Sequence, residues 1–363
     1  MEVEEALTAL AHVVEPADVQ VASLVERHGP QDVVDRIASG RLPLRTAAVL
    51  RERLRRLDLA ASRAAAARMG ARIVVRGGPD WPTQLDDLGP SRPFALWVLG
   101  AADLRLALVR SIAVVGSRSS TPYGEQVARQ WCSTFVERGA SVVSGGAFGI
   151  DAAAHRATLA CEGITVCVLA GGVDVAYPLA HEGLIARIAD EGLVVSESPL
   201  GESPRRHRFL TRNRLIAAMA GATVIVESAV RSGTAITAAH ALDLHRPLFA
   251  VPGPVTSPAS AGCHDLIASG SAALADDPVA VLSALPGVAR VADAEPLRLP
   301  LDDLTEVQSR VVDAAPSRGS ITAEELAVRA GVPVHETIAA VGQLQALGHL
   351  HRTPEGWRRP PRA

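Results

Sequence analysis

The chain of 363 residues carries a formal net charge of −3, contains no lysine, and is 48% apolar although only 3% aromatic. So much aliphatic material excludes wholesale disorder, and the length predicts two or three domains, since single cores rarely exceed about 250 to 300 residues. The N-terminus is acidic where a signal peptide is basic, no apolar run reaches the ~18 residues of a membrane span, and the four cysteines form no CxxC pair, so we expect a cytoplasmic protein without a metal site.

The first 70 residues are predicted to form a small helical domain. Residues 4–14, 18–29 and 30–40 each have apolar residues at helical spacing and end near Gly or Pro. Residues 45–70, rich in arginine and alanine, are predicted to form one longer helix. Its arginines are most simply interpreted as a solvated helix face.

Residues 71–290 are predicted to form an α/β domain. Short β-branched runs alternate there with helical patterns, and the last six of the eight runs are almost continuously apolar, as is typical of strands buried on both faces. The predicted strands are residues 71–75, 94–100, 111–116, 140–146, 164–172, 192–197, 222–227 and 247–253. The predicted helices are residues 123–139, 150–163 and 237–245. The alternation predicts a Rossmann-like, doubly wound and mainly parallel sheet.

Residues 291–363 are predicted to comprise the end of a linker and a small winged-helix-like domain. The linker is the stretch rich in Pro, Ala and Val over residues 286–300. Three helices follow at residues 304–315, 322–331 and 334–348, and residues 349–359 have the pattern of a two-stranded wing with "PEG" at its turn. Such modules bind nucleic acid or proteins, and the weakly basic composition of this one does not decide between them.

Glycine-rich loops follow four of the predicted strands. In a parallel sheet all four lie at the carboxyl edge, where ligands bind at the reversal of strand order. Glycines let backbone N–H groups approach phosphate oxygens, and helix N-termini add favourable dipoles. The loop residues are Gly116, Ser117 and Arg118; Gly145, Gly146 and Gly149 before Asp151; Gly171, Gly172 and Asp174; and Ser232, Gly233 and Thr234. Each loop alone is also explained as a tight turn, but together they predict a phosphate-binding edge.

A cationic stretch, "PRRHRFLTRNR", occupies residues 204–214 and contains five arginines, one histidine and Phe209. Because the whole chain is slightly acidic, this concentration of cations indicates a site for phosphates. A solvated helix face is the alternative interpretation.

Several classes of enzyme lack their motifs in this sequence. There is no GxxxxGK[ST], which requires lysine, and "GGAFG" is not the GxGxxG of dinucleotide-binding enzymes. Neither HExxH nor GxSxG occurs. His155 and His181 have no evident nucleophile to serve and are interpreted as structural polar groups. We therefore expect no catalytic residues and no cofactor.

Seven stretches of the chain resemble, in order and spacing, the family of the DNA-processing protein DprA, also called Smf. They are "AVVGSRSSTPYG", "VVSGGAFGIDAAAHRATL", "VLAGGVDVAYP", "VSESPLG", "RHRFLTRNRLIAAMA", "VIVESAVRSGTAITAAHAL" and "FAVPG". The resemblance is dense over residues 71–275. The two ends resemble flanking domains of the family, of the SAM or helix-hairpin-helix type at residues 1–70 and of the winged-helix type at the C-terminus.

This resemblance implies a binding protein rather than an enzyme. Members of the family bind single-stranded DNA cooperatively, form homodimers through the Rossmann-like domain and load the RecA recombinase during natural transformation. The family's DNA-binding positions correspond here to Arg118, Arg206, Phe209, Arg212, Asn213 and Arg214.

These positions imply two kinds of contact. Arg118 and Arg206 would neutralise phosphates, while Phe209 would offer a face for base stacking. Arg212 and Asn213 are expected where a helix starts at "NRLIAAMA" and adds N–H donors. For Arg212 and Arg214, pairing with Glu227 or Asp151 as internal scaffold is almost equally well supported.

Two other functions are left open by the sequence. One is a nucleotide hydrolase of the phosphoribohydrolase type, whose signature resembles GGxGTxxE. The corresponding "RSGTAITAA" has no glutamate three residues after the threonine, so that the catalytic acid is missing. The other is a winged-helix regulator of duplex DNA that uses the Rossmann-like part as a ligand sensor.

Overall fold

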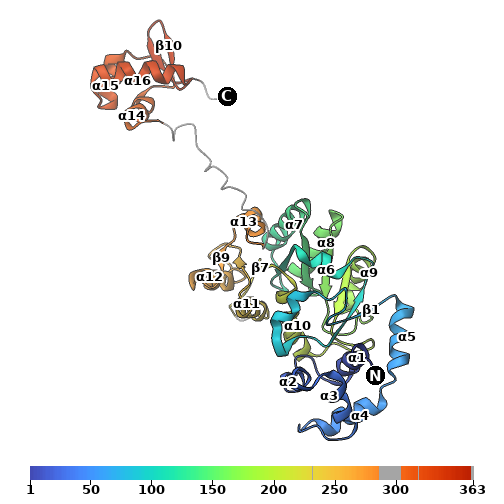
Figure 1. Cartoon of the computed structure of the whole chain (residues 1–363). Helices are drawn as coiled ribbons and strands as arrows, with labels where there is room; N and C mark the ends of the chain where they lie inside the picture. The colour runs from blue at the N-terminus through green and yellow to red at the C-terminus, as the bar shows by residue number, and fades with distance from the viewer. Residues whose placement is uncertain (231, 286–303, 318, 361–363) are drawn as a thin grey trace. The chain divides into compact units, whose positions relative to one another are not determined.

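The computed structural model describes residues 1–230, 232–285, 304–317 and 319–360 (Figure 1). The chain divides into two compact units, Met1–Ala289 and Arg290–Ala363. The predicted linker over residues 286–300 and the predicted boundary at residue 290 lie outside the described residues. The predicted boundary at residue 70 lies inside the first unit.

The described part of the first unit contains a nine-stranded sheet with the order β1-β2-β6-β5-β4-β3-β7-β8-β9. The strands are β1 (Arg72–Val75), β2 (Ala95–Leu99), β3 (Ser111–Val115), β4 (Ser141–Gly145), β5 (Thr165–Val168), β6 (Leu193–Ser196), β7 (Ala222–Ile225), β8 (Leu248–Ala250) and β9 (Ala273–Leu274). From β6 to β9 all neighbours are parallel, whereas β1 and β2 pair antiparallel. The predicted doubly wound, mainly parallel sheet is confirmed, and all eight predicted strands are present.

The strand order reverses between β3 and β7. Strands β4, β5 and β6 follow β3 toward one side of the sheet, and β7, β8 and β9 extend toward the other. The loops that leave β3 and β7 therefore diverge to opposite faces and open a crevice at the carboxyl edge. This crevice is the predicted ligand position of a doubly wound sheet.

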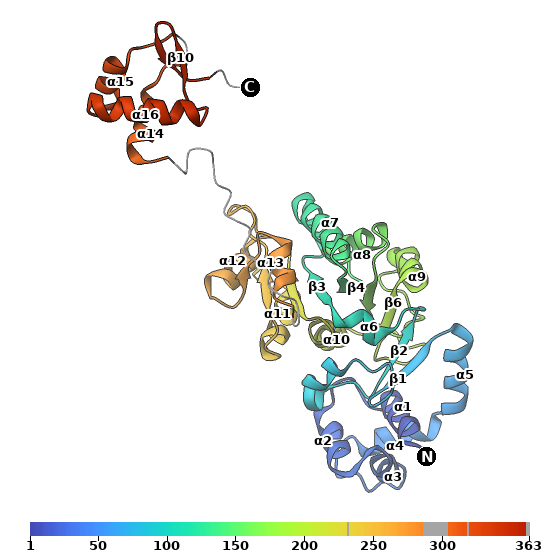
Figure 2. The same ribbon diagram turned by 45° about the horizontal axis from the view of Figure 1, so that its top comes forward.

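Helices cover both faces of the sheet because the side chains of each strand alternate between them. Ile112 and Val114 pack with α7 (Pro122–Glu137), α8 (Ile150–Ala160) and α13 (Pro278–Ser283). Ala113 and Val115 pack on the opposite face with α10 (Arg206–Met219) and α11 (Thr234–Asp243). Figures 1 and 2 show α7, α8 and α9 in a row on one flank. The remaining helical segments of this part are η1 (Thr83–Ser91), α6 (Leu104–Val109), η2 (Leu179–His181), α9 (Glu182–Glu191) and α12 (Ala261–Ala268).

The N-terminal helical region, residues 1–70, packs against the sheet. Its helices are α1 (Val3–Val13), α2 (Val19–His28), α3 (Pro30–Ala38), α4 (Ala47–Arg56) and α5 (Leu59–Met69). Leu7 of α1 and Ala66 of α5 join a buried apolar cluster with Val75 and Trp97 of β1 and β2. This contact places the region in the same unit as the sheet.

The prediction of one long helix over residues 45–70 is wrong. Two helices, α4 and α5, are separated at Leu57 and Asp58, and the Asp58 side chain accepts a hydrogen bond from the Ala61 N–H (2.9 Å). Aspartate is a strong N-cap because its carboxylate satisfies an N–H group that has no partner inside the helix. The cap starts a new helix within the apparently continuous pattern.

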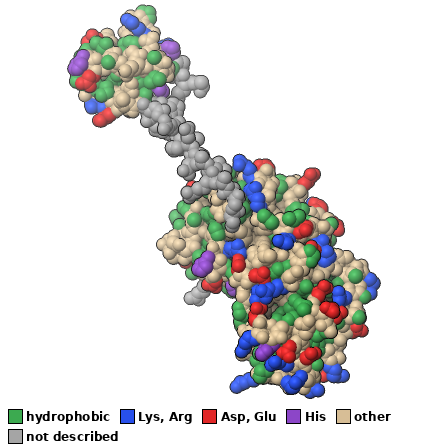
Figure 3. All heavy atoms as spheres, viewed as in Figure 1, with side chains coloured by type: hydrophobic (Ala, Val, Ile, Leu, Met, Phe, Trp, Pro, Cys, Tyr) green, Lys and Arg blue, Asp and Glu red, His purple; other side chains and the backbone are tan. Residues whose placement is uncertain are grey.

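Many arginines of the N-terminal helical region lie beside acidic side chains. Arg55 and Arg56 both pair with Glu52, and Arg63 pairs with Glu4. Figure 3 shows arginines and acidic side chains interspersed on this part of the surface. Exposed pairs of this kind contribute little to folding stability, because water and salt screen them.

The described elements of the second unit follow the order expected from the sequence, three helices and then two short strands. Its described elements are α14 (Glu306–Ala314), α15 (Ala323–Ala330), α16 (Val334–Ala346), β10 (His351–Thr353) and β11 (Gly356–Arg358). The two strands pair antiparallel, and Ile321 pairs with Trp357 across the unit. In both units, no helix of the described ranges is long and apolar enough to cross a membrane.

Candidate nucleic-acid interface

A cleft of about 450 Å³ opens at the point where the strand order reverses. Its walls come from the loop after β3, the start of α8, the cleft-facing side of α10 and the start of α11. Ten of the fourteen predicted site residues line it: Gly116, Ser117, Arg118, Arg206, Phe209, Arg212, Asn213, Ser232, Gly233 and Thr234. Three loops and one helix, distant in sequence, thus meet around one cavity.

Arg118 and Phe209 are neighbours in the cleft wall. Arg118 is exposed, and its guanidinium carbon lies 5.7 Å from the centroid of the Phe209 ring. The other neighbour of Phe209 is Tyr177, with ring centroids 5.1 Å apart. Phe209 is half-buried, so part of its ring remains accessible. The cleft therefore contains a half-buried aromatic ring with an exposed guanidinium over it.

Arg206 begins α10 at the rim of the cleft. It is exposed and forms no ion pair with any described residue. Asn213, two turns further along, donates from Nδ2 to the Gly233 carbonyl (3.3 Å) and so joins α10 to the start of α11.

The expected helix start at Asn213 is wrong, because α10 already begins at Arg206. The N–H groups of Arg212 and Asn213 therefore lie inside the helix and are not free donors. The early start was hidden because the first two turns are cationic and lack apolar spacing.

Arg212 lies at the floor of the cleft, 5% exposed, and donates to the Val168 carbonyl at the end of β5. Burial lowers its pKa, while the neighbouring Asp151 carboxylate acts in the opposite direction. Burial likewise raises the pKa of Asp151, with Arg212 opposing that shift. A Cβ at Gly145 would lie 2.6 Å from Arg212 Nη1 and 2.7 Å from Asp151 Oδ2, so glycine at this position makes room for both groups.

Arg214 is only 3% exposed and does not line the cleft. Its guanidinium makes two 2.6 Å contacts with the Glu197 carboxylate and donates to the Ser91 carbonyl (2.7 Å). The alternative of an internal scaffold role for Arg214 fits this geometry, but the partner is Glu197 rather than Glu227 or Asp151. Glu227 accepts instead from the backbone N–H and the hydroxyl of Thr121.

Two loop glycines bring backbone segments together. Gly149 has φ +76°, and a Cβ there would lie 2.2 Å from the Ser117 carbonyl oxygen. The neighbouring Ile150 N–H donates to that same carbonyl (3.2 Å). The absence of a side chain at Gly149 thus allows the loop that carries Arg118 to pack closely against the start of α8. Gly146 lines a smaller hollow of about 70 Å³, which shares Arg118 and Phe209 with the cleft.

The two histidines near the sheet edge are held by protein groups. His155 is fully buried between the Thr165 hydroxyl (2.7 Å) and the Gly145 carbonyl (2.8 Å), and burial lowers its pKa to about 4. His181 Nδ1 lies 3.0 Å from the Gly146 carbonyl. Both positions suit the structural role expected from the sequence.

Sequence reasoning missed several residues of this site. Tyr177 and Phe148 line the smaller hollow, and each is about half exposed. Arg208 is a buried ion-pair partner inside the cationic stretch. Tyr177 and Phe148 follow glycines in two of the predicted edge loops, so an exposed aromatic residue in such a loop was a usable signal. The partners of Arg208 gave no local signal.

The model of the family described as DNA recombination-mediator protein A matches residues 72–286, which include every residue that lines the cleft. Among curated relatives, the putative DNA processing protein DprA of Mycobacterium tuberculosis is 42% identical over 364 residues, covering 96% of this chain and 92% of that protein. Protein Smf of Escherichia coli is 36% identical over 275 residues, covering 75% of this chain and 73% of that protein.

Two solved structures share the fold. DNA processing protein A from Streptococcus pneumoniae superposes with a TM-score of 0.65 at 30% identity, over 78% of this chain and 98% of that one. DNA processing protein A from Helicobacter pylori, solved to show its single-stranded DNA binding mode, gives 0.53 at 28% identity, over 58% of this chain and 94% of that one.

Proposed function

Because the chain belongs to the DNA recombination-mediator protein A family, whose members are also named DprA and Smf, we propose that it binds single-stranded DNA in the cleft between the β3 and β7 loops. The observation that carries this proposal is the pairing of Arg118 with Phe209 beside Arg206. The H. pylori relative, which binds single-stranded DNA, supports the same ligand for this chain.

Charge at the cleft favours a phosphate ligand. Three basic residues, Arg206, His207 and Arg208, occupy the start of α10, where the helix dipole disfavours cations by about 0.3 to 1 kcal/mol each. Arg208 is neutralised by Glu15 and Glu202, but Arg206 and Arg118 form no ion pair with any described residue. A phosphodiester backbone supplies the missing negative charge, and bidentate contacts suit guanidinium groups.

Base stacking on Phe209 would explain a preference for single-stranded over duplex DNA. The accessible part of the Phe209 ring, backed by Tyr177, offers a platform for an unpaired base. Such stacking is worth about 1 to 3 kcal/mol per base and tolerates any sequence. In a duplex both faces of the base are already covered by its neighbours, so the platform selects single strands.

We also propose the finer properties that the family implies. The chain acts in the cytoplasm as a homodimer and delivers bound single strands to the RecA recombinase, without an enzymatic step of its own. Sedimentation of the full chain tests the dimer, and RecA filament formation on oligo-dT with and without the protein tests the delivery.

The experiment for the cleft is a competition titration of the full chain at one fixed salt concentration, with labelled oligo-dT against unlabelled oligo-dT or duplex. We expect oligo-dT to compete better. Arg118→Ala should weaken binding by about 1.5 to 3 kcal/mol, roughly ten- to hundredfold, with unchanged melting.

Arg138→Ala is the matched control. It removes the same charge from an exposed site at the other end of α7 and should bind like wild type. Equal binding by the Arg118 variant would reject the cleft as the site. Better competition by duplex would favour a duplex regulator, and release of base from nucleoside monophosphates would favour the hydrolase.

A further inference from the structure

Helix α10 presents two sides to two different cavities. Arg206, Phe209 and Asn213 line the DNA cleft described above. Arg205 and Arg208 line a second cavity of about 340 Å³, between the N-terminal helical region and residues 197–202. The first turn of α10, residues 206–209, thus separates the proposed DNA site from the N-terminal helical region.

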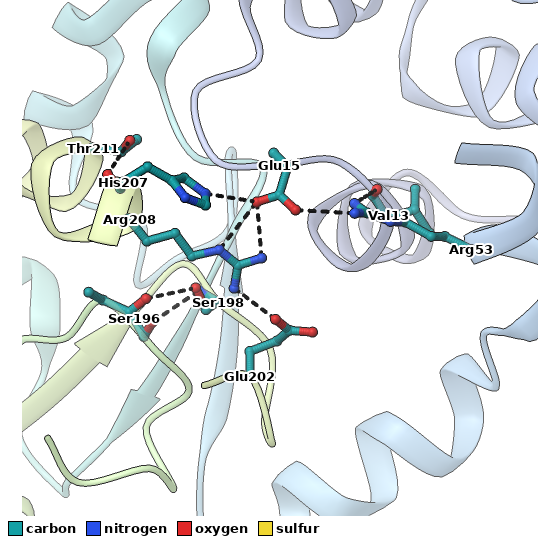
Figure 4. A network of polar contacts seen from close by, with 10 residues as sticks. Val13, Glu15, Arg53, Ser196, Ser198, Glu202, His207, Arg208 and Thr211 are labelled. Atoms are coloured by element: carbon teal, nitrogen blue, oxygen red, sulfur yellow. Dashed lines mark hydrogen bonds and ion pairs between the residues drawn. The ribbon is translucent and has the colours of Figure 1, made fainter. Parts of the chain in front are cut away.

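Arg208 fastens this turn to its surroundings (Figure 4). The side chain is 8% exposed, and its Nε and Nη2 donate to one oxygen of Glu15 at 3.2 and 3.0 Å. Its Nη1 donates to Glu202 at 2.8 Å. A buried guanidinium with all of these bonds leaves the turn little freedom to rotate.

Glu15 in turn belongs to the N-terminal helical region. It follows α1, and its other carboxylate oxygen accepts from Arg53 of α4 at 3.2 Å. Arg53 also donates to the Val13 carbonyl at 2.9 Å, which fixes the segment between α1 and Glu15. A second residue of α10, His207, places its Nε2 atom 3.6 Å from the Glu15 carboxylate. One carboxylate therefore joins α4, α1 and the start of α10.

We propose that the N-terminal helical region positions the DNA cleft, and that Glu15 is the positioning residue, acting through Arg208. Arg208 lies two residues after Arg206 and immediately before Phe209, so its anchor sets the direction in which both point. The inference rests on the proposed function, since it assigns those two side chains to DNA.

The opposite role for Glu15, as an acidic competitor of DNA, does not fit the geometry. Arg208 does not line the cleft, so Glu15 does not neutralise a cation that DNA would otherwise contact there. Removing a negative charge near DNA tightens binding when only long-range electrostatics act. Positioning predicts the reverse sign, so the direction of the effect separates the two roles.

The test compares Glu15→Gln with Glu26→Gln in the full chain. Glu26 also links the N-terminal helical region to the rest of the unit, through Arg76 (3.1 Å) and Arg92 (2.5 Å), but among the described residues it forms no ion pair with α10. Both variants lose one negative charge and one set of ion pairs. Affinity for oligo-dT, its salt slope, and amide hydrogen exchange of residues 206–210 in the free protein are measured.

We expect Glu15→Gln to bind oligo-dT several-fold more weakly, with a salt slope flatter by up to about 0.7, and to exchange faster at residues 206–210. Glu26→Gln should match wild type in all three measurements. Glu15→Asp, which keeps the charge, should restore part of the affinity and of the protection from exchange.

Equal or tighter binding by Glu15→Gln, or the same loss in both variants, overturns the proposal, as does unchanged exchange of residues 206–210. If the wild type itself fails to bind oligo-dT, the proposed function fails. The exchange measurement, made without DNA, then still decides whether Glu15 holds the first turn of α10.

Discussion

Helix geometry divides the five arginines of residues 204–214 between different surroundings. Arg205 and Arg206 are exposed, whereas Arg208, Arg212 and Arg214 are 7%, 5% and 3% exposed. Taking a charge out of water costs several kcal/mol unless it is paired or hydrogen-bonded, which is why each buried guanidinium meets a carboxylate or a carbonyl. The cationic stretch is therefore partly scaffold and partly free charge, not one uniform basic face.

Arg206 and Phe209 should respond differently to salt. If Arg206 contacts a phosphate as proposed, Arg206→Ala should lower affinity for oligo-dT at low salt and flatten the slope of log affinity against log salt by about 0.7. Phe209→Ala removes a stacking platform but no charge, and should cost roughly 1 to 3 kcal/mol with the slope almost unchanged. Fluorescence anisotropy at several salt concentrations measures both quantities.

Thermal melting of the two variants serves as the control, because Phe209 also packs on Tyr177. Identical slopes for wild type and Arg206→Ala would mean that this arginine is only solvated. A flatter slope for Phe209→Ala would mean that losing the ring displaces Arg118 as well.

The local sequence was enough to indicate the exposed arginines of the cleft. It was not enough to indicate the carboxylates that pair with the buried arginines. Arg118 was indicated by a glycine turn after a strand, and Arg206 by its place in the cationic stretch. Glu15, by contrast, is 193 residues before Arg208, and Glu197 is 17 residues before Arg214. Such pairs form only when the chain has folded, so a single sequence gives no periodicity that marks them.

At the scale of elements, β4 ends where α10 crosses it, and Gly145 is the point of contact. Gly145→Ala should destabilise the fold by about 1 to 3 kcal/mol, since its Cβ would lie within 2.7 Å of the Arg212 guanidinium and the Asp151 carboxylate. Urea denaturation measures the change. DNA affinity should fall with it, because Arg212 lines the cleft floor.

Gly183→Ala in α9 provides the matched comparison. A Cβ there meets nothing within 4 Å, and alanine favours a helix over glycine by up to about 1 kcal/mol. This variant should be as stable as wild type or more so. A Gly145→Ala protein with wild-type stability would show that Arg212 can move aside without loss.

Helices and strands were predictable where burial imposes a regular spacing of apolar residues. They were less predictable where the segment is rich in charged residues. Strands β3 to β8 are buried on both faces and read as apolar runs. Strand β9 consists of only two residues, both exposed, and carries no such signal. The start of α10 was missed for its cations, and the break between α4 and α5 was missed although Asp58 is a good N-cap.

At the scale of the whole molecule, the first unit should be separable and the N-terminal helical region should not. A fragment of residues 1–289 is expected to have the melting temperature that the first unit has in the full chain. It should also keep the oligo-dT affinity of the full chain. Residues 71–290, although they contain every motif of the cleft, should melt at lower temperature and bind more weakly. Removal of residues 1–70 exposes the apolar cluster that contains Val75 and Trp97, and it also removes Glu15.

Calorimetry and anisotropy on the two fragments check this prediction. Equal stability and affinity for residues 71–290 and residues 1–289 would contradict it and would make the N-terminal helical region an independent module. The sequence favoured such a module because the composition changes near residue 70. It could not reveal that Leu7 and Ala66 complete the covering of β1 and β2.

The attachments of α10 also have a consequence for how the protein would resist mechanical tension. If single-stranded DNA binds as proposed, a strand drawn through the cleft would pull on Arg206 and Phe209, and the force would enter the helix at its first turn. Arg208 passes it to Glu15 and Glu202, Arg212 to the end of β5, and Arg214 to Glu197 next to β6. A loop under the same pull would straighten at its weakest bond. Here three attachments along one helix would share the force, so we expect the grip on the strand to fail only when several of them break together.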